Sequence, residues 1–342
     1  MSTEYDRLAG PLRQIVGHVH RIRSLTIVLS TELGAEVLAL FRDVAAPNLQ
    51  HLEVVNRSRN EWGAVEMFYS GASKMNSLQI CGLKLKLPVA PWVAYLTHLE
   101  LRRGQYHFDD VSNSLDLVAL TAEYPSLISL LSDISWIWDP TAVRRFHIPS
   151  LKFLHISISD GEDKHFLLNI LDRLDTPALT EFVIDGTHGD QIGVLFNATS
   201  LPHSSFSALT SLSFVQRGPF CACDSDLQFS FDDISAPPLA LFPALSSLSF
   251  INQCLTPKLI TDILGPASQP WMRLQTVTLC PDLSVFDLVC TALKDAVDSK
   301  HQSGQCLPKL RVSPVLFSSE EWQDNGVDAD IFDPVDILAS FD

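Results

Sequence analysis

At 342 residues the chain is longer than one ordinary hydrophobic core, and its 46% hydrophobic and 19% charged residues are typical of a folded protein. The net charge of −16 disfavours nucleic acid as the main partner, because binding to a phosphate backbone needs a basic stripe. No apolar run approaches the roughly 18 residues of a membrane span, and residues 1–20 lack the apolar core of a secretory signal. We therefore expect a cytoplasmic or nuclear protein whose seven cysteines are reduced thiols.

A short motif, apolar-x-x-apolar-x-apolar, recurs along the whole chain. Its clearest pair is FSALTSLSF at Phe206–Phe214 and FPALSSLSF at Phe242–Phe250, which are identical at seven of nine positions. A single match means little in a chain of this composition, so the order and spacing of the matches carry the prediction. The motif predicts eleven strands, and the match at Leu127 is weaker because Ser132 takes the last apolar place. The motifs begin at Ile22, Leu49, Met75, Leu96, Leu127, Leu151, Leu179, Leu209, Leu245, Leu274 and Leu307.

The segments between the motifs predict helices. Stretches 33–45, 164–177 and 283–300 each place apolar residues on one helical face. Proline also stands two residues before the first apolar place in five motifs, where it would end a helix and favour extended backbone. These prolines are Pro47, Pro125, Pro149, Pro177 and Pro243. Each repeat should therefore run strand, turn, helix, turn, and then the next strand.

This order resembles a leucine-rich repeat, in which stacked strand–helix units share one continuous core. We expect an α/β fold: an irregular solenoid, or horseshoe, with a parallel concave sheet and helices on the convex side. The expected layout is an N-terminal cap at 1–20, about eleven repeats over 21–317 with an inserted loop at 216–241, and an acidic C-terminal cap or tail at 318–342. The tail has a second interpretation, as an acidic and hydrophobic docking peptide. The usual asparagine of the repeat is missing, so its turns must be satisfied by other groups.

With strand starts of the form P-[SAN]-L and the opening HVHRIRSLTI at 18–27, residues 8–317 resemble the repeat region of F-box proteins from mushroom-forming fungi. The resemblance implies the substrate-recognition part of an SCF-type ubiquitin ligase, in which an F-box binds the adaptor Skp1 and the repeats hold the substrate. The first repeat is expected near Ile22, which leaves no room for an F-box. No adaptor-binding residue can be carried over, and Skp1 is expected as a partner only if an F-box lies upstream.

In such a repeat the third, fifth and seventh places of each motif lie on the concave face. Charged, aromatic and imidazole side chains on this face carry binding energy better than hydroxyls do. We therefore expect the early and middle repeats to bind a protein partner, while the later repeats offer mainly serine and threonine. The candidate partner-binding residues are His51, Glu53, His98, Glu100, Arg102, Phe153, His155, Glu181 and Asp185.

Catalytic and metal-binding patterns are weak. Cys221 and Cys223 lack a second ligand pair at zinc spacing, and His18 and His20 lack a third ligand nearby. The sequence contains no phosphate-binding loop, no G-x-S-x-G and no H-E-x-x-H. We expect a protein that is not an enzyme, with no catalytic residues, no metal and no cofactor. The alternatives are a repeat scaffold without a ubiquitin role and, less favoured, an enzyme on an α/β domain.

Overall fold

The computed structural model divides the chain into two compact units, Met1–Ile156 (unit 1) and Ser157–Asp342 (unit 2), and each is described by itself. The structure describes residues 2–29, 34–57, 67–83, 94–102, 124–133, 145–158, 163–187, 189–196, 206–216, 241–253, 255–264, 273–281, 286–304, 306–312 and 329–331. The inserted loop expected at 216–241 and the acidic tail expected at 318–342 lie almost entirely outside these residues.

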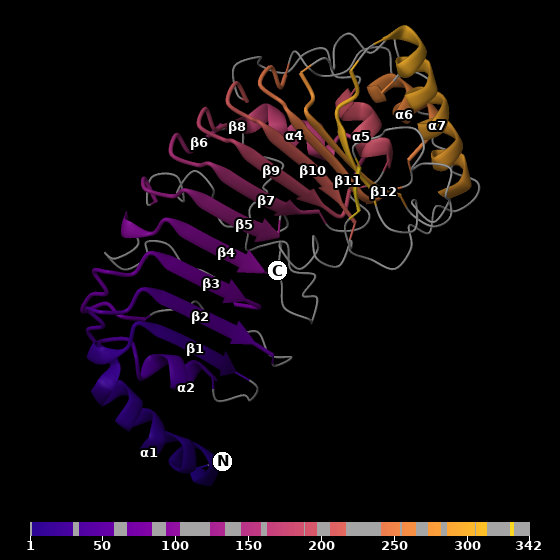
Figure 1. Cartoon of the computed structure of the whole chain (residues 1–342). Coiled ribbons are helices and arrows are strands. Elements are labelled where there is room, and N and C mark those ends of the chain that lie inside the picture. Colours follow the sequence, from indigo (N-terminus) through magenta and orange to yellow (C-terminus); the bar gives the residue numbers. More distant parts are fainter. Residues whose placement is uncertain are drawn as a thin grey trace. The chain divides into compact units, whose positions relative to one another are not determined.

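Unit 1 contains strands and few helices within its described part (Figure 1). Its elements are α1 (Ser2–His18), the 3₁₀ turn η1 (Val19–Arg21), β1 (Ser24–Leu29), α2 (Gly34–Ala39), β2 (His51–Asn56), β3 (Ser77–Cys81), β4 (His98–Arg102), β5 (Ser129–Asp133), β6 (Phe146–His147) and β7 (Phe153–Ser157). The last residue of β7 already belongs to unit 2.

Unit 2 contains both strands and helices within its described part, and helices separate several of the successive strands. Its elements are α4 (Phe166–Arg173), β8 (Leu174–Asp175), β9 (Glu181–Asp185), α5 (Gly189–Phe196), β10 (Ser211–Val215), β11 (Ser247–Gln253), α6 (Pro257–Leu264), β12 (Thr276–Pro281), α7 (Phe286–Ser303), β13 (Lys309–Val312) and β14 (Ala329–Ile331). In Figure 1, α4 and α5 lie behind the strands of this unit.

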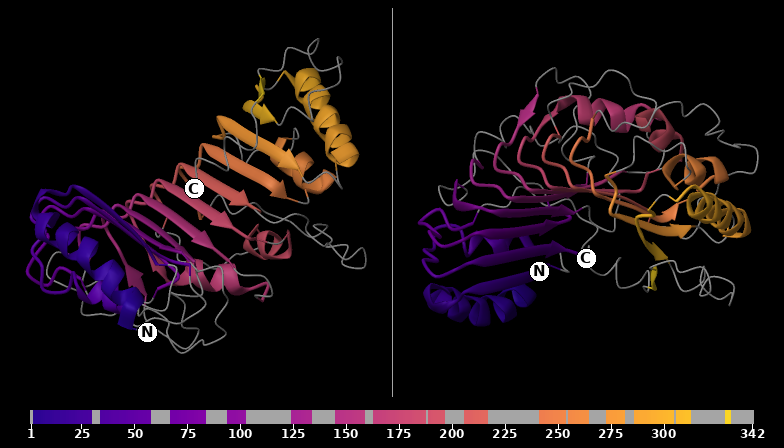
Figure 2. Two further views of the ribbon diagram at one scale, coloured as in Figure 1. Left: turned by 90° about the horizontal axis from the view of Figure 1, so that it is seen from below. Right: turned by 45° about the horizontal axis from the view of Figure 1, so that its top comes forward.

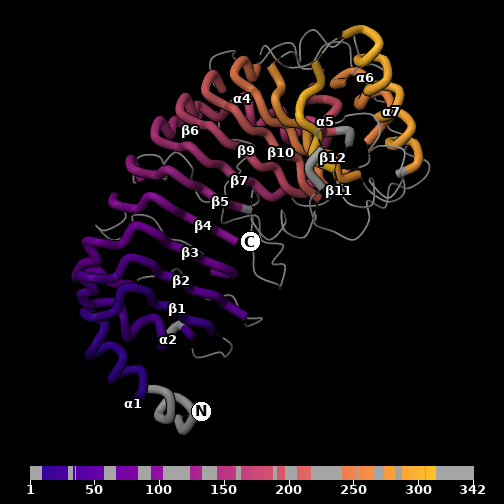
Figure 3. The backbone as a smooth tube through the Cα atoms, in the orientation of Figure 1, coloured from indigo at the N-terminus to yellow at the C-terminus, as the bar shows by residue number. Residues whose placement is uncertain are grey.

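All eleven predicted motifs form strands, and neighbouring strands pair in parallel. The strand order is β1-β2-β3-β4-β5-β7 in unit 1 and β9-β10-β11-β12-β13-β14 in unit 2. Every pair from β1 to β5 and from β9 to β14 is parallel. Figure 3 follows this progression strand by strand, and Figure 2 shows the same ladders from two other sides. The chain therefore has a mixed α/β fold built on parallel ladders, as predicted.

The register of the ladders matches the motif place by place. In unit 2, Leu212 lies opposite Leu248 and Phe214 opposite Phe250, so the two near-identical stretches are successive repeats. The rings of Phe214 and Phe250 stack with their centroids 5.5 Å apart. Apart from Ser132, the first, fourth and sixth places are apolar, and after the first repeat they are buried almost throughout, because stacking places each repeat's apolar side against its neighbour. Leu25 on the terminal strand β1 is only half-buried.

A tight turn precedes most strands, and it explains the recurring proline. The N–H of the first motif residue bonds the carbonyl of the residue three places before it, as in Leu49 to Ala46 (3.1 Å) and Leu245 to Phe242 (3.1 Å). Pro47 and Pro243 take the second position of these turns, where a fixed φ is favourable. Proline thus sets a turn whose first residue is buried, rather than ending a helix directly as predicted.

The strand ends use other groups in place of the missing asparagine. The N–H groups of Gly82 and Gly186 bond to carbonyls of the following repeat at 3.0 and 2.8 Å, and both glycines have positive φ, which glycine adopts without strain. The buried side chain of Asn56 donates to the Gly82 carbonyl at 3.0 Å. Another side-chain bond, between buried groups, runs from Gln253 to Thr187 Oγ1 at 3.3 Å. The turns are satisfied by a varied set of amides and hydroxyls.

The helix predicted at 283–300 forms over nearly the expected residues, as α7, whereas the helix predicted at 164–177 is shorter, because α4 ends at Arg173 and Leu174–Asp175 form β8. The helix predicted at 33–45 is shorter, because α2 ends at Ala39 and the chain continues in i to i+3 turns. Phe41 is buried, and its carbonyl accepts the N–H of Phe68 at 2.9 Å. In a continued helix this carbonyl would instead accept the N–H four residues further along the chain.

Candidate functional site

The parallel register defines a candidate binding surface in unit 1. We call the side chains at the third, fifth and seventh motif places of β1 to β5 and β7 the unit 1 face, excluding Ser157, which belongs to unit 2. These side chains alternate with the buried core residues of the same strands, as the two-residue period of a strand requires. Because the pairing is in motif register, side chains from strands about 4.8 Å apart form continuous rows.

Among the described side chains of this face, the third-place row has more exposed members than the other two rows. His51 and His98 are exposed, and the serines between and beside them are half-buried or exposed. The Thr97 hydroxyl and His98 Nδ1 lie 2.8 Å apart, within hydrogen-bond distance. This row therefore presents two imidazoles to solvent on alternate strands.

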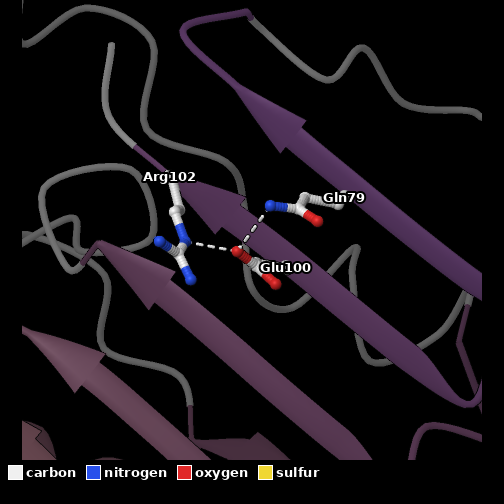
Figure 4. Close-up of polar contacts among 3 residues, drawn as sticks. All are labelled: Gln79, Glu100 and Arg102. Carbon is white, nitrogen blue, oxygen red and sulfur yellow. Dashed lines mark hydrogen bonds and ion pairs between the residues drawn. The ribbon is translucent and has the colours of Figure 1, made fainter. Parts of the chain in front are cut away.

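The fifth-place row holds two polar pairs, each joining neighbouring strands. Thr26 Oγ1 donates to Glu53 Oε2 at 2.9 Å, and Gln79 Nε2 donates to Glu100 Oε1 at 2.9 Å. Arg102, at the seventh place of the same strand as Glu100, pairs with that same oxygen through Nε (Figure 4). The Arg102 and Glu100 side chains keep 28% and 23% of their surface exposed, so this pair is held in place yet reachable from solvent.

On the unit 1 face, burial raises the pKa of two acidic side chains, Glu100 and Cys81, and so favours their neutral forms. Partial burial raises the pKa of the Glu100 carboxyl, and the nearby Glu53 adds to the rise. The Arg102 guanidinium and His155 oppose this rise without cancelling it. Burial likewise raises the pKa of the Cys81 thiol, at the seventh place of β3. A cation brought to Glu100 would therefore stabilise a charge that the protein itself leaves incompletely compensated.

The predicted binding residues fall into three groups in the structure. His51, Glu53, His98, Glu100, Arg102 and Phe153 lie on the unit 1 face and are exposed or half-buried. His155 belongs to the same face but is only 1% exposed, so its imidazole is not reachable from solvent. Glu181 and Asp185 belong to unit 2, where Glu181 is half-buried and Asp185 is 5% exposed. That these residues bind a partner stays a prediction.

In unit 2 the equivalent face is largely covered. Val183 and Thr278 at fifth places, and Val215, Ile251 and Cys280 at seventh places, are all buried. The third places remain half-buried or exposed, and burial raises the pKa of the Glu181 carboxyl there. The part of the predicted surface open across all three rows is therefore in unit 1.

Sequence reasoning missed Gln79 and Thr26, which complete the fifth-place contacts. Only charged, aromatic and imidazole residues were selected as candidates, and these two are none of the three. Their place in the motif was the available signal, since they stand at the same fifth place as Glu53 and Glu100.

Other candidate chemistry has little support in the described residues. Cys221 and Cys223 lie outside them, and no group of three or more metal-ligating side chains occurs within them. The cysteines that the structure describes, Cys81, Cys280, Cys290 and Cys306, are free thiols. Among the helices described, none has the length and apolar character that crossing a membrane requires.

Comparison with known proteins adds little. A scan against protein-family models gives no match, and a search of curated proteins gives none either. A crystal structure of a Bacteroides fragilis protein aligns with 91% of this chain and 76% of its own length, at a TM-score of 0.38 and 12% sequence identity. A likeness this distant supports no conclusion on fold or function.

Proposed function

We propose that this chain is a non-catalytic, protein-binding solenoid of leucine-rich-repeat type, and that the unit 1 face contacts its partner. One observation carries the proposal: in unit 1 a parallel ladder holds rows of charged, amide and imidazole side chains that remain reachable from solvent. A ladder fixes such groups before binding, so less conformational entropy is lost when a partner arrives.

The resemblance to fungal F-box proteins supports a more specific role, recognition of the substrate of an SCF-type ubiquitin ligase. A repeat scaffold without a ubiquitin role is the alternative. Expression with any upstream coding sequence distinguishes the two, because Skp1 should co-purify only if an F-box is present. The less favoured alternative, an α/β enzyme, would require a concave pocket with convergent polar side chains.

The binding proposal is tested by site-specific crosslinking. A photoreactive residue in place of exposed His98 should capture a defined partner from cell extract, whereas the same residue in place of exposed Asp295 on α7 should not. Replacing Glu100 and Arg102 together by alanine should reduce capture, with a melting temperature lowered by no more than about two degrees, since both groups are partly exposed. Equal capture from both positions, or capture unaffected by the double replacement, contradicts the proposal.

A further inference from the structure

Glu53 and Glu100 on the unit 1 face each use one carboxylate oxygen to accept contacts from their own chain. The other oxygen of each carboxylate makes none of these contacts. Glu53 accepts the Thr26 hydroxyl through Oε2, and Glu100 accepts both Gln79 and Arg102 through Oε1. In Figure 4 the second oxygen of Glu100 points away from both of these contacts. Within the described residues neither Glu53 Oε1 nor Glu100 Oε2 has a hydrogen-bond partner. Each carboxylate is thus oriented by its own chain and still able to accept a charged donor.

The register fixes the spacing of these two acceptors. Glu53 lies opposite Gln79, and Gln79 lies opposite Glu100, so the carboxylates stand two strands apart. Two strand spacings amount to about 9.6 Å. A polyproline II helix repeats every three residues at about 3.1 Å per residue, or about 9.3 Å per turn. Side chains three residues apart on such a segment therefore match the separation of the two glutamates. In an extended strand, same-side residues lie about 6.8 Å apart and fit less well.

The surroundings of the two glutamates suit such a segment. Val55 and Cys81, at seventh places of β2 and β3, are half-buried and offer an apolar floor for proline rings. His51 and His98 flank the carboxylates on the other side and are exposed. The net charge of −16 would also speed the approach of a cationic partner at low salt.

We propose that the unit 1 face binds a basic, proline-rich segment of a partner protein that lies across β2, β3 and β4 in polyproline II conformation. Cationic side chains three residues apart pair with Glu53 and Glu100. This inference rests on the proposed function and names the chemistry of its partner.

Two labelled peptides of identical composition test the spacing. One is Arg-Pro-Pro-Arg-Pro-Pro-Arg and the other Arg-Arg-Arg-Pro-Pro-Pro-Pro, each titrated with the full chain while fluorescence anisotropy is recorded at low ionic strength. The spaced peptide should bind about tenfold more tightly than the clustered one, because only it can reach both carboxylates at once. Equal affinities, or tighter binding of the clustered peptide, would overturn the inference.

Single charge-removing variants test the two contacts. Glu53→Gln and Glu100→Gln should each weaken binding of the spaced peptide by about five- to tenfold. Asp295→Asn changes the net charge equally at an exposed site on α7 and should leave the affinity unchanged. Glu53 keeps the test independent of folding, since Glu53 is half-buried and, among the described residues, its side chain accepts a hydrogen bond from exposed Thr26, which a glutamine oxygen can also accept. If either glutamine variant behaves like Asp295→Asn, the inference fails.

The outcomes also separate this inference from the proposed function. A partner captured at position 98 that lacks a basic segment, and whose capture survives Glu53→Gln, overturns the inference and leaves the binding function intact. If no partner is captured at position 98 but peptide binding depends on spacing, the result contradicts the proposed function and leaves the peptide chemistry of the unit 1 face supported.

Discussion

Units 1 and 2 are built from the same repeated motif and differ in what their strand faces expose. At fifth and seventh places unit 1 carries Glu53, Gln79, Glu100 and Arg102, which are half-buried. At the same places unit 2 carries mostly apolar or small side chains, and most of these are buried. The repeat therefore determines the ladder and its register, while the exposure of the side chains between the core positions differs between the two units.

The largest expected effect tests the core that both units share. Leu154 in unit 1 and Leu212 in unit 2 stand at the same fourth motif place and are 2% and 1% exposed. Replacing either by alanine should lower the free energy of unfolding by about 2–5 kcal/mol, measured by urea denaturation. Leu288 on α7 is 58% exposed and provides the control, because its replacement should cost less than about 0.5 kcal/mol. A stable Leu154→Ala variant would place that residue on the surface.

The second prediction concerns a strand end in unit 2. Gly186 has φ +78°, and a Cβ added there would clash with the backbone carbonyl of Ile158. Gly186→Ala should therefore cost about 2–3 kcal/mol or more, whereas Gly304→Ala should cost about 1 kcal/mol. Gly304 has a similar φ of +67° but open space around it. Thermal unfolding of both variants checks the difference, and equal losses would mean that Gly186 is not packed against that carbonyl.

A matched pair of valines compares the two faces directly. Val55 in unit 1 and Val215 in unit 2 occupy the same seventh place, but Val55 is half-buried and Val215 is 1% exposed. Val215→Ala should lower stability by about 2 kcal/mol, and Val55→Ala by less than about 1 kcal/mol. Chemical denaturation of the two variants gives the values. Losses of the same size would remove the distinction between an open and a closed face.

The smallest effect is a dependence on pH. The pKa of Glu100 is raised in the folded protein, so the folded state holds its proton more tightly than the unfolded chain does. Stability from this group should fall as pH rises from the ordinary glutamate pKa through the raised one. Glu100→Gln should remove that fall. Above the pH range between the two pKa values, the variant should be more stable than the wild type by up to about 1 kcal/mol. Chemical denaturation across the acidic pH range measures the difference. If the variant is more stable than the wild type only below that pH range, the predicted sign is wrong.

The strands and their register could be predicted because hydrophobic periodicity is a local property of the sequence. The weak motif at Leu127 is a strand, with buried Ser132 in the last apolar place. The turns were less predictable, since Pro243 is compatible with a helix end as well as with the second position of a turn. The end of α2 depends on a bond between Phe41 and Phe68, which no local pattern reveals.

The exposure of the candidate site could be predicted only in part. His155 and Asp185 have the chemistry of binding residues, and their burial depends on tertiary packing. One signal for the closed face was nevertheless present, because Val183 places an apolar residue at a fifth place, where unit 1 has mainly polar ones. Because only charged, aromatic and imidazole side chains were selected as candidates, this difference between units 1 and 2 was not predicted.

Two native cysteines test the difference between the faces most directly. Cys81 and Cys280 both occupy the seventh place of a strand motif, in unit 1 and unit 2 respectively, and Cys81 is half-buried while Cys280 is 4% exposed. Alkylation of the folded protein, followed by peptide mass spectrometry, should modify Cys81 well before Cys280. Modification of Cys280 as fast as Cys81 would contradict an open face in unit 1 and a closed one in unit 2.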